Sequence, residues 1–220
     1  MLPTDLSKVI AHLRDREYMG GVSRDQVRVD STGEVFTPTS LVIKTLDAMD
    51  KSAFIDPKET FLEPSCGDGQ FLSEVIIRKM ENNIPYEVAL STVYGIDLME
   101  DNCLECIKRL YGVYREPKIR IIKGDDIPEE WQSTYKVTTI ETIDGKKIRK
   151  TTIHKSLTAV FEIDGKICNI VCGDGLTYDY RFGVLPTVID DAPSLLSSLL
   201  SKAKKAKARI AETGLFDFNK

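Results

Sequence analysis

The amino-acid sequence predicts an α/β fold built on an open, largely parallel sheet. Short apolar runs at 60–63, 92–96 and 119–122 alternate with helical periodicity over 70–80 and 100–111. A strand–helix–strand–helix–strand order of this kind is typical of parallel strands joined by crossover helices. Two Asp-Gly turn signals further along the chain predict antiparallel β-hairpins added to that sheet.

Length and composition limit the classes of protein to which the chain can belong. The 220 residues are 42% hydrophobic and 29% charged, as expected for one packed domain with an appendage, or for two very small domains. No run of about 18 apolar residues is present to form a transmembrane helix, and the first residues lack the apolar core of a secretory signal. The five cysteines, an odd number, suggest reduced thiols, so we expect a cytoplasmic location and no membrane partner.

Two helices are predicted before the first strand. Residues 3–18 carry an apolar stripe at helical spacing, and Gly20 ends it. A second helix begins near Thr37 and Pro38, because threonine suits the capping position and proline suits the first helical turn.

A glycine turn between the first strand and the next helix carries the strongest chemical signal. Gly67 and Gly69 allow a ligand to approach the backbone closely, and the following helix directs free N–H groups toward the same place. Asp97 ends the next strand, where an acid can accept hydrogen bonds from ribose hydroxyls or can cap the helix that follows. A tight sheet turn with no ligand is the alternative interpretation of the glycines.

The residues around the turn favour one nucleoside ligand over another. A dinucleotide site requires a third glycine, and Leu72 occupies that position. Glu63 and Asp68 would repel a diphosphate, whereas a cationic sulfonium ligand with an ammonium group tolerates both acids. The sequence therefore favours S-adenosylmethionine and disfavours a nicotinamide-dependent oxidoreductase.

Three segments together resemble one family of enzymes. Gly-Glu-Val-Phe-Thr-Pro (33–38), Glu-Pro-Ser-Cys-Gly-Asp-Gly-Gln-Phe-Leu (63–72) and Val-Tyr-Gly-Ile-Asp-Leu-Met-Glu-Asp-Asn (93–102) are similar, in order and spacing, to motifs of the gamma-type adenine-N6 DNA methyltransferases. The resemblance covers roughly residues 17–127. It implies a Rossmann-like class I methyltransferase sheet, S-adenosylmethionine as cofactor and DNA as partner.

The same resemblance implies roles for residues at the methionine end of the cofactor. Thr37 and Pro38 would line this end, and Glu63 would hold it. The glycine turn would contribute backbone groups, from Pro64, Cys66, Gly67 and Gly69.

At the nucleoside end, the resemblance implies that Asp97 holds the ribose and that Leu98 packs on the adenine. A further acid after the third strand would contact the adenine amine, and two aspartates qualify. Asp125 has the natural spacing, whereas Asp174 stands in a string that is closer to the family's wording. Either aspartate also fits a simple turn.

The family's catalytic tetrapeptide, Asn or Asp followed by Pro-Pro and an aromatic residue, does not occur in the sequence. The nearest string is 190–194, in which Asp191 and Pro193 are the candidate catalytic residues; the same string also suits the start of a helix. The resemblance implies more strands and a target-recognition domain than this chain has. We therefore expect either a partner chain that completes the enzyme, or a methylase-like protein that binds cofactor without transfer, as in a phage accessory or anti-restriction role.

The cysteine pairs, a basic stretch and the apolar tail each allow a structural interpretation as well as a functional one. The pairs Cys103/Cys106 and Cys168/Cys172 suit buried thiols better than zinc, and no metal is expected. The basic stretch 202–209 suits a solvated helix or a phosphate-backbone contact. The apolar tail 215–218 suits docking on its own core or on a sliding clamp.

The chain thus divides into five predicted segments. They are an N-terminal helical segment (1–33), the S-adenosylmethionine-binding core (34–133), a β-hairpin insertion (134–172), the end of the core (173–194), and a C-terminal basic helix and tail (195–220).

Overall fold

The computed structural model describes residues 6–14, 37–143 and 146–183. The described residues all belong to the first of two compact units, Met1–Gly183 and Val184–Lys220. Predictions for 184–194, for the basic helix and for the tail therefore lie outside the described residues.

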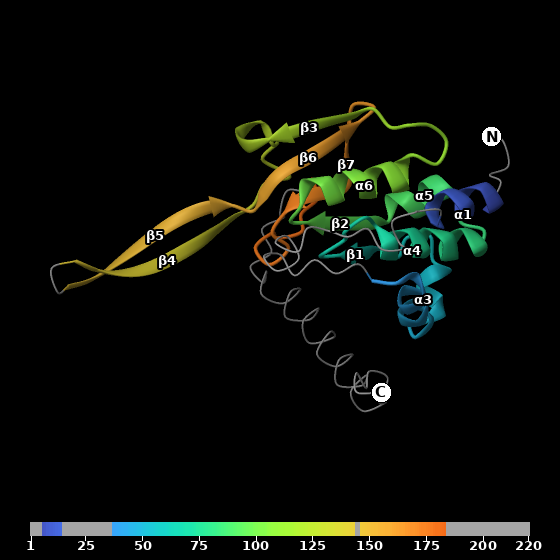
Figure 1. The fold of residues 1–220 in the computed structure, drawn as a ribbon, viewed down its shortest axis with the longest axis horizontal. Helices are drawn as coiled ribbons and strands as arrows, with labels where there is room; N and C mark the ends of the chain where they lie inside the picture. The colour runs from blue at the N-terminus through green and yellow to red at the C-terminus, as the bar shows by residue number, and fades with distance from the viewer. Residues whose placement is uncertain (1–5, 15–36, 144–145, 184–220) are drawn as a thin grey trace. The chain divides into compact units, whose positions relative to one another are not determined.

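The main sheet has five strands in the order β1-β2-β7-β6-β3 (Figure 1). Strands β1 (Phe61–Glu63), β2 (Val93–Asp97) and β7 (Lys166–Gly173) are parallel neighbours. Strand β6 (Leu157–Ile163) runs antiparallel to β7, and β3 (Ile119–Lys123) pairs antiparallel with β6 at the edge. The protein is thus an α/β protein, as the sequence predicts at this level, and its main sheet is mixed, with two parallel and two antiparallel strand pairs.

Strand β3 does not occupy the position that the sequence order predicts. The strand beside β2 is β7, whereas β3 lies two strands further away. A central strand must be apolar on both faces, and Ile170, Val171 and Cys172 of β7 are all buried. Strand β3 exposes Arg120 and Ile121, which suits an edge position.

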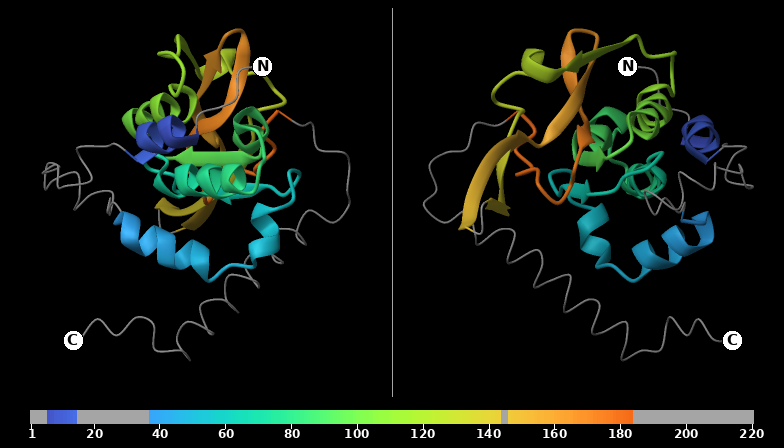
Figure 2. Two further views of the ribbon diagram at one scale, coloured as in Figure 1. Left: turned by 90° about the vertical axis from the view of Figure 1, so that its right-hand side faces the viewer. Right: turned by 60° about the vertical axis from the view of Figure 1, so that its left-hand side comes forward.

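The helices share one hydrophobic core with the main sheet. They are α1 (Leu6–Arg14), α3 (Thr39–Asp47), α4 (Gln70–Glu81), α5 (Tyr86–Ser91) and α6 (Glu100–Tyr111). A 3₁₀ turn, η2 (Lys51–Phe54), adds Phe54 to the same core. Helices α1, α4 and α6 lie side by side, so the segment at the start of the described chain packs next to the helix that follows the glycine turn (Figure 2).

A second, smaller core uses other residues of the same sheet. Ile96 of β2 and Val171 of β7 pack there with Trp131 and Tyr178. The ring of Phe182 makes edge contacts with both Trp131 and Tyr178. This core therefore depends on loop aromatic residues, and Tyr178 is a buried structural residue.

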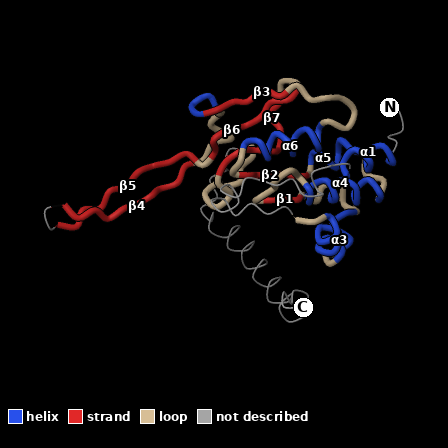
Figure 3. The backbone as a smooth tube through the Cα atoms, in the orientation of Figure 1, coloured by secondary structure: helices blue, strands red, loops and turns tan. Residues whose placement is uncertain are grey.

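The segment 134–172 divides into two different structures. Strands β4 (Thr134–Ile143) and β5 (Lys146–Lys155) form a separate two-stranded sheet that extends away from the main sheet (Figure 3). Strands β6 and β7 belong to the main sheet. Both predicted hairpins are confirmed, and Asp164 and Gly165 turn the second one with φ values of 52° and 79°.

None of the helices within residues 6–14, 37–143 and 146–183 combines the length and the apolar character needed to cross a bilayer.

Candidate functional site

The carboxyl ends of three parallel strands bring the predicted acids to one edge of the sheet. Glu63 ends β1 and pairs with Gly95, two residues before Asp97 at the end of β2. Asp97 pairs with Cys172 of β7, and Asp174 follows two residues later. In open α/β sheets, ligands bind at such an edge.

The glycine turn after β1 depends on its two glycines for conformation and for space. Gly67 and Gly69 have φ values of 51° and 82°, a region that other residues rarely adopt. A Cβ atom on Gly69 would lie only 2.7 Å from the Sγ of Cys106. The side chain of Cys66 is buried beneath the turn, and the hydrogen bond with Cys106 together with burial raises the pKa of its thiol well above the ordinary value. Cys66 is thus a structural residue and not a nucleophile.

Three backbone N–H groups of the turn, those of Cys66, Gly67 and Gly69, are engaged within the protein. Cys66 donates to the carbonyl oxygen of Ile96 at 2.9 Å, and Gly69 donates to that of Cys66 at 2.8 Å. Gly67 donates to Oδ2 of Asp97 at 2.9 Å. The predicted role of these amides as donors to a ligand is therefore not available in this conformation.

Asp97 holds the start of the helix that follows it, a role close to the capping expected from the sequence, and its carboxylate can still accept a further hydrogen bond. Its Oδ1 accepts from the backbone N–H of Met99 at 2.9 Å and from Nδ2 of Asn102 at 3.1 Å. Together with the bond from Gly67, three hydrogen bonds reach a carboxylate that has about four acceptor positions. The carboxylate can still accept one further donor, such as a hydroxyl.

The carboxyl group of Glu63 has no cationic partner in the described chain. It is half-buried, and burial raises the pKa of its carboxyl to about 7 despite a hydrogen bond from the backbone of Ser65, with the charge of Asp97 adding to the increase. A carboxyl group held near neutrality in this way is typical of a functional site.

Asp68 does not contribute its charge to the site. Its carboxylate forms a buried ion pair with Arg109 at 2.6 Å, and Arg109 also donates to the carbonyl oxygen of Leu13 in α1. The repulsion of a diphosphate that the sequence assigned to Glu63 and Asp68 therefore comes from Glu63 and Asp97 instead.

The start of α3 is joined to the glycine turn. Nε2 of Gln70, the first residue of α4, donates to Oγ1 of Thr39 at 2.8 Å. Thr37 and Pro38 directly precede Thr39 in the sequence. The sequence assigned no role to Thr39 or Gln70, although Gln70 directly follows Gly69.

Gln70 also presents an unsatisfied acceptor beside the turn. Its side chain is only 5% exposed, and its Oε1 has no donor in the part of the chain that the structure describes. A buried carbonyl oxygen without a donor is costly, and a ligand with N–H groups could reach this acceptor only after a local rearrangement, because the atom itself is buried.

Of the two candidate aspartates, Asp174 is the one beside the other acids, because it follows β7, the strand next to β2, whereas β3 lies two strands further along the sheet. The residue after it, Gly175, packs so closely that a Cβ atom would lie 2.5 Å from the carbonyl oxygen of Pro64. One carboxylate oxygen of Asp174 accepts from the backbone N–H of Leu176 at 2.8 Å. Asp125, by contrast, lies in the 3₁₀ turn after β3, at the far edge of the sheet, and pairs with Lys155.

An exposed apolar side chain adjoins the acids. Leu98 follows Asp97 directly and is 59% exposed. Its position is the one the resemblance assigns to packing on adenine.

Two further sets of predicted residues were the candidate catalytic residues and the cysteines. Asp191 and Pro193, the candidate catalytic residues, lie outside the described residues. All five cysteines are free and buried, and within the described ranges no three His, Cys, Asp or Glu side chains are grouped to hold a metal ion.

The sequence matches no protein-family model and no curated protein, and the structure matches no solved structure. What the chain does must therefore be inferred from the geometry and charge of the site itself.

Proposed function

We propose that the edge formed by β1, β2 and β7 binds S-adenosylmethionine, and that the chain serves as an adenine-N6 DNA methyltransferase with a Rossmann-like core. One observation carries this proposal. Glu63 is a half-buried carboxyl beside Asp97 with no cationic partner in the described residues. Such a pair of acids favours a ligand that brings positive charge.

The same groups argue against a dinucleotide. A pyrophosphate requires free N–H donors, and those of Cys66, Gly67 and Gly69 already have acceptors within the protein. Two carboxylates at the strand ends would also repel it. A sulfonium ligand with an ammonium group instead brings donors and positive charge to a site that is rich in acceptors.

In this proposal the described residues would hold the parts of the cofactor as follows. Glu63 and Oε1 of Gln70 would accept from the ammonium group, next to Thr37 and Pro38. Asp97 has one acceptor position left for a ribose hydroxyl. When bound, S-adenosylmethionine supplies a methyl group activated on its sulfonium.

The nucleobase end of the cofactor would lie further along the same edge. Leu98 offers an exposed apolar surface on which adenine can pack. Asp174 would accept from the exocyclic amine, because its second carboxylate oxygen has no hydrogen-bond partner in the described chain. Asp125 is too far along the sheet to take this role.

Transfer to DNA requires acceptors that hold the target amine, and the candidates are Asp191 and Pro193 or the residues of a partner chain. A second function is cofactor binding without transfer. The sequence favours it in one respect, since no Asn or Asp followed by Pro-Pro and an aromatic residue occurs.

Calorimetric titration of the full chain with S-adenosylmethionine and with NAD tests the cofactor. We expect S-adenosylmethionine alone to bind, and Glu63→Gln to weaken it at least tenfold. Glu59→Gln, which changes an exposed acid four residues away, is the matched control. Preferential binding of NAD would overturn the proposal.

Methyl transfer from labelled cofactor to unmethylated duplex DNA separates the two functions. Label in the DNA supports the transferase. If the chain by itself binds the cofactor but leaves no label in the DNA, then it either binds cofactor without transfer or needs a partner chain for transfer.

A further inference from the structure

A long β-ribbon made of β4 and β5 extends from the main sheet without a hydrophobic face of its own. The strands pair over their whole length, from Thr134 with Lys155 to Ile143 with Lys146 (Figure 1). At about 3.4 Å per residue, ten residues span about 34 Å. Every residue of β5 is exposed, and so is β4 from Thr138 to Thr142.

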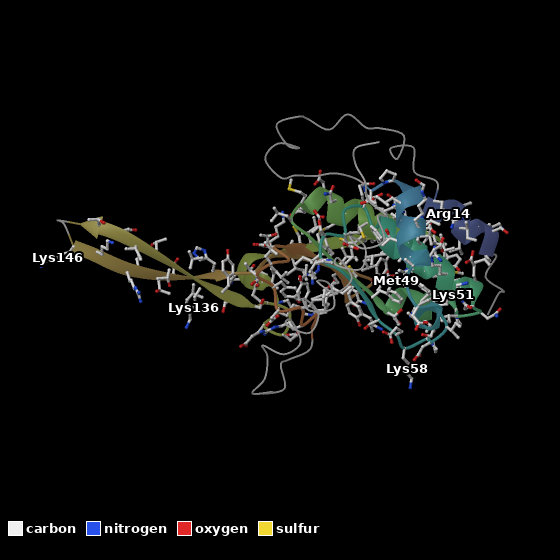
Figure 4. All side chains as sticks on the ribbon, turned by 90° about the horizontal axis from the view of Figure 1, so that it is seen from below. Arg14, Met49, Lys51, Lys58, Lys136 and Lys146 are labelled. Carbon is white, nitrogen blue, oxygen red and sulfur yellow. The ribbon has the colours of Figure 1, made fainter. Side chains whose placement is uncertain are left out.

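The ribbon is basic, although the chain as a whole is acidic. Residues 134–155 contain six Lys or Arg against two acids, a net charge of +4, whereas the whole chain carries −4. Lys136 and Lys146 lie along the ribbon, away from the rest of the described chain (Figure 4).

The register concentrates cations on one side of the ribbon. Two residues that pair directly across the strands have their side chains on the same face of the ribbon. Because side chains alternate along a strand, every second pair lies on that face. One such face, called the basic face below, consists of Thr134, Lys136, Thr138, Ile140 and Thr142 of β4 with Lys147, Arg149, Thr151, Ile153 and Lys155 of β5. It holds four cations and no acid, whereas the opposite face carries Glu141 together with Lys146 and Lys150.

The charges of the basic face are largely uncompensated. Lys136, Lys147 and Arg149 form no ion pair within the described ranges, and only Lys155 has a partner, Asp125. Between the cations lie the hydrogen-bonded hydroxyls of Thr138 and Thr151, 3.0 Å apart. Ile140 and Ile153 are exposed by 60% and 67%.

This combination indicates a polyanion with regular charge spacing. Successive pairs on one face are about 6.8 Å apart, and phosphates follow one another about every 3.4 Å along each strand of duplex DNA. A two-stranded ribbon fits the major groove, which is about 12 Å wide. The hydroxyl and methyl groups between the cations suit contacts with the edges of the bases. An acidic protein, the alternative partner, has no base edges to contact.

We propose that the basic face of the β4–β5 ribbon binds double-stranded DNA by entering its major groove, with Lys136, Lys147 and Arg149 at the phosphates. The inference rests on the proposed function for its ligand. It deepens that function because it assigns the contact with the DNA substrate to an element outside the cofactor site.

Binding of the full chain to a labelled duplex, measured by fluorescence anisotropy over a range of salt concentrations, tests the inference. The variant K136Q/R149Q removes two charges from the basic face, and K146Q/K150Q removes two from the opposite face of the same ribbon. All four side chains are exposed, so both variants are expected to fold like the wild type.

We expect K136Q/R149Q to weaken binding at least tenfold and to lower the slope of log K against log salt by about two. The control should weaken binding less than threefold. Equal losses in the two variants, or no binding of duplex DNA by the wild type, would overturn the inference.

A duplex RNA of the same sequence and poly-glutamate are further probes. The major groove of RNA is too narrow for a ribbon, so we expect weaker binding to RNA and none to poly-glutamate. Equal or tighter binding of either probe would overturn the groove contact.

Cofactor titration of K136Q/R149Q distinguishes this inference from the proposed function. DNA binding that depends on the basic face, in a chain that binds no S-adenosylmethionine, supports the ribbon inference and contradicts the proposed function. Cofactor binding and methyl transfer that are indifferent to K136Q/R149Q would support the proposed function and overturn the ribbon inference.

Discussion

The backbone N–H of Gly67 donates to Oδ2 of Asp97 across 2.9 Å and joins the turn after β1 to the last residue of β2. The other oxygen of the same carboxylate holds Met99 and Asn102 at the start of α6. One acid therefore fixes the glycine turn, a strand end and a helix start. Its replacement should affect the fold and the cofactor site together.

Asp97→Ala should lower the free energy of unfolding by about 3 kcal/mol, because it leaves buried donors without an acceptor. Chemical denaturation measures the loss. Glu105→Ala is the control, since Glu105 makes only an exposed pair with Lys108 and its removal should change stability by less than about 0.5 kcal/mol. A loss below about 1 kcal/mol for Asp97→Ala would contradict the structural role.

Glu63 makes stability depend on pH in a predictable direction. Its pKa of about 7 in the folded chain lies above the ordinary value of 4.5, so the folded state is favoured while this group is protonated, and that advantage is lost as pH rises through 7. Between pH 5 and pH 8 the wild type should lose about 2 kcal/mol that Glu63→Gln does not lose. Denaturation of both proteins at the two pH values checks this, and parallel pH profiles would refute it.

Gly69→Ala should be more harmful than Gly165→Ala, although the φ values are nearly equal, 82° and 79°. A methyl group on Gly69 would meet Cys106, whereas no atom lies within 4 Å of one on Gly165. We expect a loss of about 3 kcal/mol for Gly69→Ala and about 1 kcal/mol for Gly165→Ala, measured by thermal or chemical unfolding. Similar losses would show that backbone strain alone matters.

The buried pair of Asp68 and Arg109 fastens the glycine turn to α1. Asp68→Ala leaves a buried guanidinium without its carboxylate, so we expect a loss of about 3–5 kcal/mol in unfolding free energy. Arg120→Ala, which breaks an exposed pair with Glu162, serves as the control and should cost less than about 1 kcal/mol. If the two losses are alike, the pair at Asp68 is not the anchor described.

Local patterns were sufficient to predict the elements around the site. The strands ending at Glu63 and Asp97 and the helix after Gly69 follow directly from apolar periodicity and turn residues. The tight turn at Asp164 and Gly165 follows from the preference of that dipeptide for positive φ.

Relations between distant residues were not predictable in the same way. Strands 119–123 and 166–173 are both apolar, and only burial on both faces decides which of them lies beside β2. This choice also decides between Asp125 and Asp174. The ion pair of Asp68 joins residues 41 positions apart, and the acceptor of the Gly67 amide comes from the next strand, so neither has a local signal.

The affinity for S-adenosylmethionine at pH 7 and at pH 5.5 tests the central claim most directly. The α-amino group of the ligand stays protonated over this range, whereas Glu63, with a pKa of about 7, loses its negative charge as the pH falls to 5.5. We predict that the wild type binds about tenfold more weakly at pH 5.5, and that Glu63→Gln binds weakly at both pH values. Wild-type affinity that is equal at the two pH values, or unchanged in Glu63→Gln, would contradict a cation site built on Glu63.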